Sequence, residues 1–245
     1  MSGNTDLRYV GLVADGNTDK EILAKVVTCL FENDERCHVL SLRQSFRDCV
    51  DQFTQMSSKS GNYCLSGRPA TELRKKILRI LFAALRDFEN LCKRDLFHRD
   101  LMVLNTDAEF YLVHSDRYFS ERWALCLTSS FLKAAEEFYH HQSNRYRWTN
   151  LPMILPLVFF PSIDVLVAAA KTRHDQSFSY RGLRARVIKK NLYGTEDLRD
   201  LQREQLEDVA LRYITRDSVR SAYELLPEFR TFFRTMAWSA ACNIS

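Results

Sequence analysis

Glycine and proline are scarce, at 7 and 5 of 245 residues, and no repeat or low-complexity tract is present. Disordered segments are richer in such residues, so the composition favours a folded domain. The chain also lacks any run of about 18 uncharged apolar residues, which a membrane-spanning helix needs. Its first residues, MSGNTDLR, lack the apolar stretch of a signal peptide. We therefore expect a soluble, cytoplasmic protein with no membrane partner.

The seven cysteines are scattered singly, with an odd total and no C-x-x-C pair. This pattern indicates neither a zinc site nor a disulfide framework. No cysteine lies in a setting of histidine and aspartate that would favour a nucleophile, so we interpret all of them as reduced thiols. The formal net charge of +4 permits an anionic partner without requiring one.

Apolar segments of strand length alternate with segments of helical periodicity. With 46% hydrophobic residues, a chain of this length can bury a full core. The pattern predicts strands at 8–14, 37–42, 100–106 and 151–160, and helices after Asp19, at 71–93, at 120–142, after Asp164 and over 195–239, with a polar loop at 54–69. Such alternation predicts an α/β, Rossmann-like fold, in which helices flank both faces of a mainly parallel sheet.

We divide the chain into an α/β domain at residues 1–190, with an insertion near 43–95, and a helical C-terminal extension at 191–245. The extension is rich in charge in its first part and ends in an amphipathic, aromatic-rich segment. Asn17 or Thr18 is the expected N-cap of the first helix.

Acidic residues follow three of the predicted strands. Asp15 comes directly after the first strand, Asp107 and Glu109 end the strand at 100–106, and Asp164 lies just past the last strand. In open parallel sheets the working site lies beyond the carboxyl ends of the strands. Hard divalent cations bind carboxylate, water and phosphate oxygens, so this arrangement suits phosphodiester chemistry with a metal ion.

Each acid also has a purely structural interpretation. Asp15 precedes a glycine, which is a common turn pair, and Asp107 could cap a helix or form an Asx turn. Glu109 would suit the first turn of a helix, and Asp19 could simply face solvent there. The convergence of these acids on one edge of the sheet favours the metal site.

Two short segments then resemble the Toprim domain, the acidic fold of topoisomerases, primases and OLD-type nucleases. Residues 13–19, VADGNTD, resemble its first motif, in which a Glu-Gly pair precedes Thr/Ser-Asp, and residues 103–109, VLNTDAE, resemble its strand ending in Asp-x-Asp. The segments at 161–164, 189–190 and 227–233 keep the order of later elements in small stand-alone bacterial Toprim-like proteins. Three acids differ from the family pattern by one methylene and keep their charge: Asp15, Glu109 and Asp164.

The resemblance implies a Toprim-like domain in which Asp107 and Glu109 bind Mg²⁺ or Mn²⁺ against a substrate phosphate. It implies that Asp15 is the general base or acid, or a further metal ligand. Asp19 would support the first motif, through the metal or through the turn.

The resemblance also gives supporting roles to Asp164 and to Lys189 or Lys190, which could neutralise charge on the transferring phosphate. A lysine pair of this kind equally suits a solvated helix end. Arg181 and Arg184, in a polar segment with a tyrosine, together with Lys190, are the candidate contacts to a nucleic-acid backbone.

The resemblance implies a metal-dependent nuclease that acts on DNA or RNA in prokaryotic anti-phage defence. No segment resembles a P-loop, so ATP-driven control would come from a separate ATPase subunit. A catalytically inactive Toprim-fold scaffold, or a nucleic-acid-binding subunit, is the main alternative. A small-molecule phosphohydrolase or nucleotidyl transferase is a third.

Overall fold

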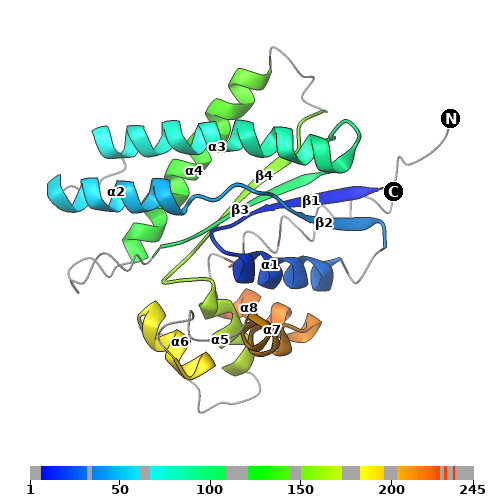
Figure 1. Ribbon diagram of the computed structural model, residues 1–245, viewed down its shortest axis with the longest axis vertical. Coiled ribbons are helices and arrows are strands. Elements are labelled where there is room, and N and C mark those ends of the chain that lie inside the picture. Colours follow the sequence, from blue (N-terminus) through cyan, green and yellow to red (C-terminus); the bar gives the residue numbers. More distant parts are fainter. Residues whose placement is uncertain are drawn as a thin grey trace.

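The structure is a computed structural model, and it describes residues 7–31, 35–60, 67–108, 121–143, 150–172, 183–195, 203–226, 229–230 and 234. In chain order its elements are β1 (Arg8–Val13), α1 (Asn17–Leu30), β2 (Cys37–Ser41), α2 (Arg47–Ser60), α3 (Arg68–Cys92), β3 (Leu101–Asp107), α4 (Glu121–Gln142), β4 (Met153–Phe159), α5 (Asp164–Thr172), α6 (Ala185–Tyr193), α7 (Arg203–Arg212) and α8 (Arg216–Leu225) (Figure 1). Strands and helices alternate through the first two thirds of the chain, as the sequence predicts.

The four strands form one sheet in the order β2-β1-β3-β4, and every neighbouring pair is parallel. The predicted α/β fold with a mainly parallel sheet is therefore confirmed. From β1 the chain crosses to β2 on one side and returns to β3 on the other. Because crossovers between parallel strands keep one hand, α1 covers one face of the sheet, and α2, α3 and α4 cover the opposite face (Figure 1).

Both faces of the sheet are buried. Val10 and Leu12 of β1 point into a core shared with α1, α5, α6, α7 and α8, whereas Val13 points into the core under α2, α3 and α4. In β3, Val103 and Leu104 divide between the two cores in the same way. Strands covered on both faces read as continuous apolar runs, which is why the sequence located β1, β3 and β4.

The loop predicted at 54–69 is wrong in its first part, because helix α2 extends into it. Val50 and Phe53 are buried on the inner face of this helix, and Thr54 and Ser57 continue that face. Thr54 Oγ1 donates a hydrogen bond to the carbonyl of Val50 at 3.0 Å. A hydroxyl satisfied within its own helix can be buried, which explains why Thr54 belongs to the inner face of α2.

Helices α7 and α8 lie in the segment predicted to be helical. Ala210 of α7 and Val219 of α8 are buried in the core that also contains α1 and α5. Helix α8 begins with a capping box, in which Thr215 and Ser218 exchange hydrogen bonds at 3.2 and 2.8 Å. The C-terminal helices thus complete one face of the sheet, and the domain boundary at residue 190 stays a prediction.

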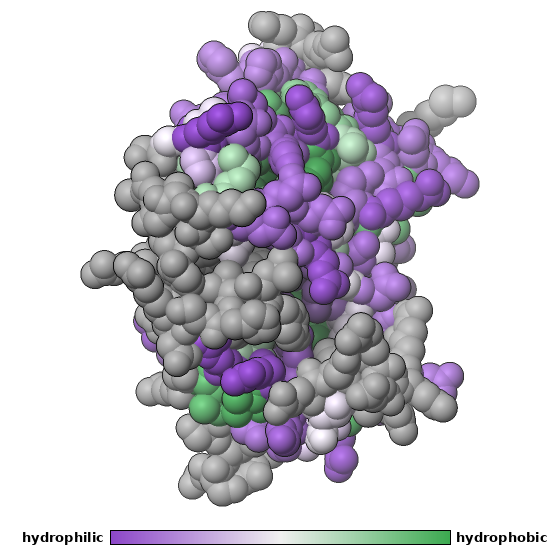
Figure 2. Space-filling model, turned by 60° about the vertical axis from the view of Figure 1, so that its left-hand side comes forward, coloured by the Kyte–Doolittle hydropathy of each residue, from purple (hydrophilic) through white to green (hydrophobic). Residues whose placement is uncertain are grey.

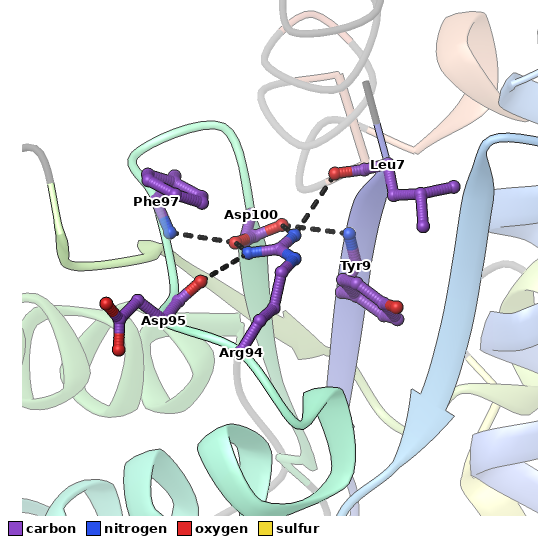
Figure 3. Close-up of polar contacts among 6 residues, drawn as sticks. All are labelled: Leu7, Tyr9, Arg94, Asp95, Phe97 and Asp100. Atoms are coloured by element: carbon purple, nitrogen blue, oxygen red, sulfur yellow. Dashed lines mark hydrogen bonds and ion pairs between the residues drawn. The ribbon is translucent and has the colours of Figure 1, made fainter. Parts of the chain in front are cut away.

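An ion pair between Arg94 and Asp100 lies at the edge of the sheet where the strands begin. Asp100 is fully buried, and Nη1 and Nη2 of Arg94 donate to its two carboxylate oxygens at 2.8 and 2.7 Å (Figure 3). The N–H groups of Tyr9 and Phe97 donate to the same carboxylate at 2.9 and 2.8 Å, and Arg94 also donates to the carbonyl of Leu7 at 3.1 Å. The pair therefore ties the start of β1 to the connection between α3 and β3.

Hydrophilic side chains cover most of the described surface that Figure 2 shows, with smaller apolar areas between them. Leu91 and Leu132 are the large hydrophobic residues exposed among those described, at 43% and 54%. None of the described helices combines the length and the apolar character that crossing a membrane requires.

Candidate acidic site at the carboxyl edge of the sheet

The predicted acids meet where the strand order changes direction. Asp107 is the last residue of β3, and Asp15 follows the end of the neighbouring strand β1 by two residues. Asp19 lies in the first turn of α1 and Asp164 begins α5, after β4. This junction between β1 and β3 is the topological switch point of the sheet, where ligands of α/β proteins bind.

Asp15 is held by three hydrogen bonds. Its Oδ1 accepts from the hydroxyl of Ser45 at 3.2 Å and from the N–H of Phe46 at 3.0 Å, and its Oδ2 accepts from Thr106 Oγ1 at 2.6 Å. Burial raises the pKa of Asp15, while these donors, Thr106 first, act in the opposite direction. The carboxylate therefore joins the β1–α1 turn to β3 and to the start of α2.

Asp19 points into the cluster instead of into solvent. Gly16, with extended backbone angles of −135° and 163°, is the N-cap of α1, so the predicted N-cap at Asn17 or Thr18 is wrong. Asp19 is three residues further on, and its carboxylate accepts the N–H of Gly16, as in one half of a capping box. Burial, and then the charges of Asp164 and Asp15, raise the pKa of Asp19 from 3.8 to about 7.

Asp107 connects the end of β3 to the turn after β4. Its Oδ1 accepts the N–H of Ile163 at 2.7 Å. Burial raises its pKa well above the ordinary value, the charge of Asp19 adds to this effect, and Lys189 opposes it. Oδ2 of Asp107 accepts no hydrogen bond from the described residues.

A second group of polar side chains surrounds Asp164, which is 4% exposed. Its Oδ1 accepts from the hydroxyl of Tyr193 and its Oδ2 from the hydroxyl of Ser162, each at 2.9 Å. Lys189 Nζ lies 3.5 Å from the same Oδ2 and is also buried, so the interpretation of Lys189 as a solvated helix end is wrong. Burial and the charge of Asp164 raise the pKa of Tyr193 far above its usual range.

Sequence reasoning did not single out Tyr193 or Ser162. Lys189 and Tyr193 are four residues apart, so they lie on one face of a helix. This spacing was the sequence signal that could have identified Tyr193 as a neighbour of Lys189. Ser162 lies directly before the acid in the turn after β4, where a hydroxyl commonly bonds a neighbouring polar group.

The remaining predicted residues are placed differently. Glu109 and Arg181 lie outside the described residues. Arg184 is the half-buried N-cap of α6. Lys190 is exposed on the same helix, whereas its neighbour Lys189 is buried.

The donor set is made of oxygens alone, which suits a hard cation. Within the described part of the chain, no three or more histidine, cysteine, aspartate or glutamate side chains form a group that could hold a metal ion. Mg²⁺ commonly takes only one or two carboxylates and completes its shell with water and phosphate oxygens. The carboxylate of Asp107 and the neighbouring charge of Asp19 fit that smaller requirement.

The fold and the site together define an α/β protein with a buried acidic cluster at the switch point of a parallel sheet. No protein-family model, curated protein or solved structure matches the chain. The Toprim resemblance therefore rests on the two sequence motifs, at residues 13–19 and 103–109, and stays a prediction.

Proposed function

We propose that the protein is a metal-dependent phosphodiesterase with a Toprim-like fold that cleaves nucleic acid. The observation that supports this most is the gathering of four carboxylates, those of Asp15, Asp19, Asp107 and Asp164, at the switch point of the sheet. Burial, and then the charges of the neighbouring acids, raise the pKa of Asp19 and Asp107. Groups with such perturbed pKa values concentrate at functional sites, because burying like charges together opposes folding.

In this proposal Asp107 and Asp19 hold Mg²⁺ or Mn²⁺. The cation would neutralise charge on the phosphate and activate a water molecule. Asp15 fixes the turn that carries Asp19, since its carboxylate joins that turn to Thr106 of β3 at 2.6 Å. Lys189 supplies a positive charge beside the reacting phosphate, and Glu109 is a further candidate ligand.

The test compares cleavage of labelled DNA and RNA, in Mg²⁺ and in Mn²⁺, by the wild type and by Asp107→Asn. Losing an outer partner of a metal site costs up to about 100-fold in activity, and losing a ligand should cost at least as much. Asp95→Asn is the matched control, because the Asp95 carboxylate points away from the ion pair at the opposite edge of the sheet (Figure 3). Equal cleavage by the wild type and Asp107→Asn would contradict the proposal.

A second candidate is a non-catalytic subunit that binds nucleic acid. Two observations favour it. The carboxylate of Asp15 already accepts three hydrogen bonds from the protein, and Asp164 is already paired with Lys189. This candidate predicts that the labelled strands are retained uncut in either metal and that Asp107→Asn binds them as well as the wild type. Weaker binding by Lys190→Ala would then locate the contact on the exposed side of α6.

We also propose, from the resemblance alone, that the protein acts in prokaryotic anti-phage defence beside a separate ATPase subunit. Phage plating on cells that express the wild type or Asp107→Asn tests the setting. Protection by the wild type alone is the expected result, and equal plating on both strains would contradict it.

A further inference from the structure

Helix α6 carries a lysine into the acidic cluster. Lys189 is 8% exposed, although the neighbouring residue Lys190 is exposed. Its Nζ lies 3.5 Å from Oδ2 of Asp164. Ile188 and Leu192 of the same helix are buried in the core with α1 and α5, so the packing of α6 fixes where the ammonium group lies.

Asp164 is itself held in place. Tyr193, one turn after Lys189 on the same helix face, donates to its Oδ1, and Ser162 donates to its Oδ2. The carboxylate thus has two hydroxyl donors in addition to the ammonium group. These contacts dock the inner face of α6 onto the start of α5 and keep Lys189 at the cluster.

We propose that Lys189 is the resident counter-ion of the acidic cluster, and that a divalent cation binds to these carboxylates in competition with its ammonium group. This inference rests on the proposed function, because it concerns the same cation. It adds that the affinity for the cation is limited by a charge that the protein itself provides.

The charge of Lys189 acts on the two carboxylates that were assigned to the cation. It lowers the pKa of both Asp19 and Asp107 against the larger effect of burial. Like charges repel more strongly in a buried site than in water, because the effective dielectric constant is lower. A cation that joins Asp107 must therefore overcome the repulsion of Lys189 or displace its ammonium group, and removing that charge should strengthen binding.

The competition also gives Lys189 a second anionic partner. An ammonium group displaced from Asp164 lies beside the site where the substrate phosphate would bind. By thermodynamic reciprocity, phosphate that pairs with Lys189 should strengthen cation binding, and the cation should strengthen phosphate binding.

The test measures Mn²⁺ binding by calorimetry for the wild type, Lys189→Met and Arg186→Met. Arg186 is exposed on the same helix, so its replacement removes the same net charge outside the cluster. We expect Lys189→Met to bind Mn²⁺ about tenfold more tightly than the wild type or better, and Arg186→Met to change affinity by less than about twofold. Asp107→Asn should abolish binding, which confirms that the titration reports on this site.

Each outcome is decisive. Equal Mn²⁺ affinity in the wild type and Lys189→Met overturns the counter-ion proposal and leaves the proposed function standing. Absence of Mn²⁺ binding in every variant removes the cation from the proposed function, and the counter-ion proposal fails with it. If Lys189→Met unfolds without metal, refolding by Mn²⁺, followed by circular dichroism, supports the proposal, and failure to refold contradicts it.

Discussion

Replacing Asp19 by asparagine should stabilise the protein at pH 8 and should stabilise it much less at pH 5. The folded-state pKa of Asp19 is raised from 3.8 to about 7, first by burial and then by the charges of Asp164 and Asp15. At pH 8 the folded protein holds this carboxylate in its ionised form at a cost. Between pH 7 and pH 4 the folded state binds a proton that the unfolded state releases, so the wild type gains stability as the pH falls.

The size of the effect follows from the pKa. At about 1.4 kcal/mol for each pKa unit, a rise from 3.8 to about 7 corresponds to roughly 4 kcal/mol. This is an upper bound, because Asp19 is half-buried and solvent screens part of the repulsion. Asparagine keeps an oxygen that can accept the N–H of Gly16, so we expect a net gain of about 1–3 kcal/mol at pH 8.

Urea unfolding of the wild type and Asp19→Asn at pH 5 and pH 8 measures the difference. Asp217→Asn is the matched control, since Asp217 is an exposed acid in the first turn of α8, outside the acidic cluster. A variant less stable than the wild type at pH 8, or a difference that is the same at both pH values, would show that the ionised Asp19 does not destabilise the folded state.

Three further changes in the free energy of unfolding can be measured by the same method. Asp100→Asn should cost about 3–5 kcal/mol, because it leaves the guanidinium of Arg94 without its buried carboxylate; a loss below 1 kcal/mol would contradict the role of this pair. Gly11→Ala should cost about 1–3 kcal/mol, because the added Cβ would lie 3.0 Å from a neighbouring leucine and 3.2 Å from a phenylalanine ring; an unchanged midpoint would show that the space relaxes. Thr106→Val should cost about 1–3 kcal/mol, because Asp15 loses its donor at 2.6 Å, and a more stable variant would argue against that contact.

The parallel sheet was predictable because its strands are buried on both faces. Each of the strands at 8–13, 101–107 and 153–159 contains an apolar run in the sequence. Parallel strands present their carboxyl ends at one edge, so the common location of Asp15 and Asp107 followed from the strand assignment alone.

The internal arrangement of the site was not predictable, because it depends on contacts between distant segments. Asp19 was expected to face solvent or to support the turn, and only the packing of α1 into the core that also contains α5 brings its charge near that of Asp164. Lys189 looked like a solvated helix end, and α6 turns that side of the helix toward Asp164. Tyr193 had no motif of its own, since its role comes from the acid that it contacts.

The polar start of the predicted loop at 54–69 was misassigned for a local reason. Thr54 and Ser57 carry hydroxyl groups that lower the apparent hydrophobicity of a helix face, yet both are buried on α2. Polarity alone cannot distinguish such a face from a loop when a hydroxyl, such as that of Thr54, bonds within the helix.

In the proposed function, Asp107 and Asp19 share a divalent cation. The decisive measurement is the anomalous scattering of a crystal soaked in Mn²⁺ at the manganese absorption edge. A shared cation gives an anomalous peak at about 2.0–2.6 Å from Oδ2 of Asp107, with a carboxylate oxygen of Asp19 in the same coordination shell. A fully soaked crystal with no peak at the carboxyl edge of the sheet, or with its peak elsewhere, would show that these carboxylates do not hold the cation.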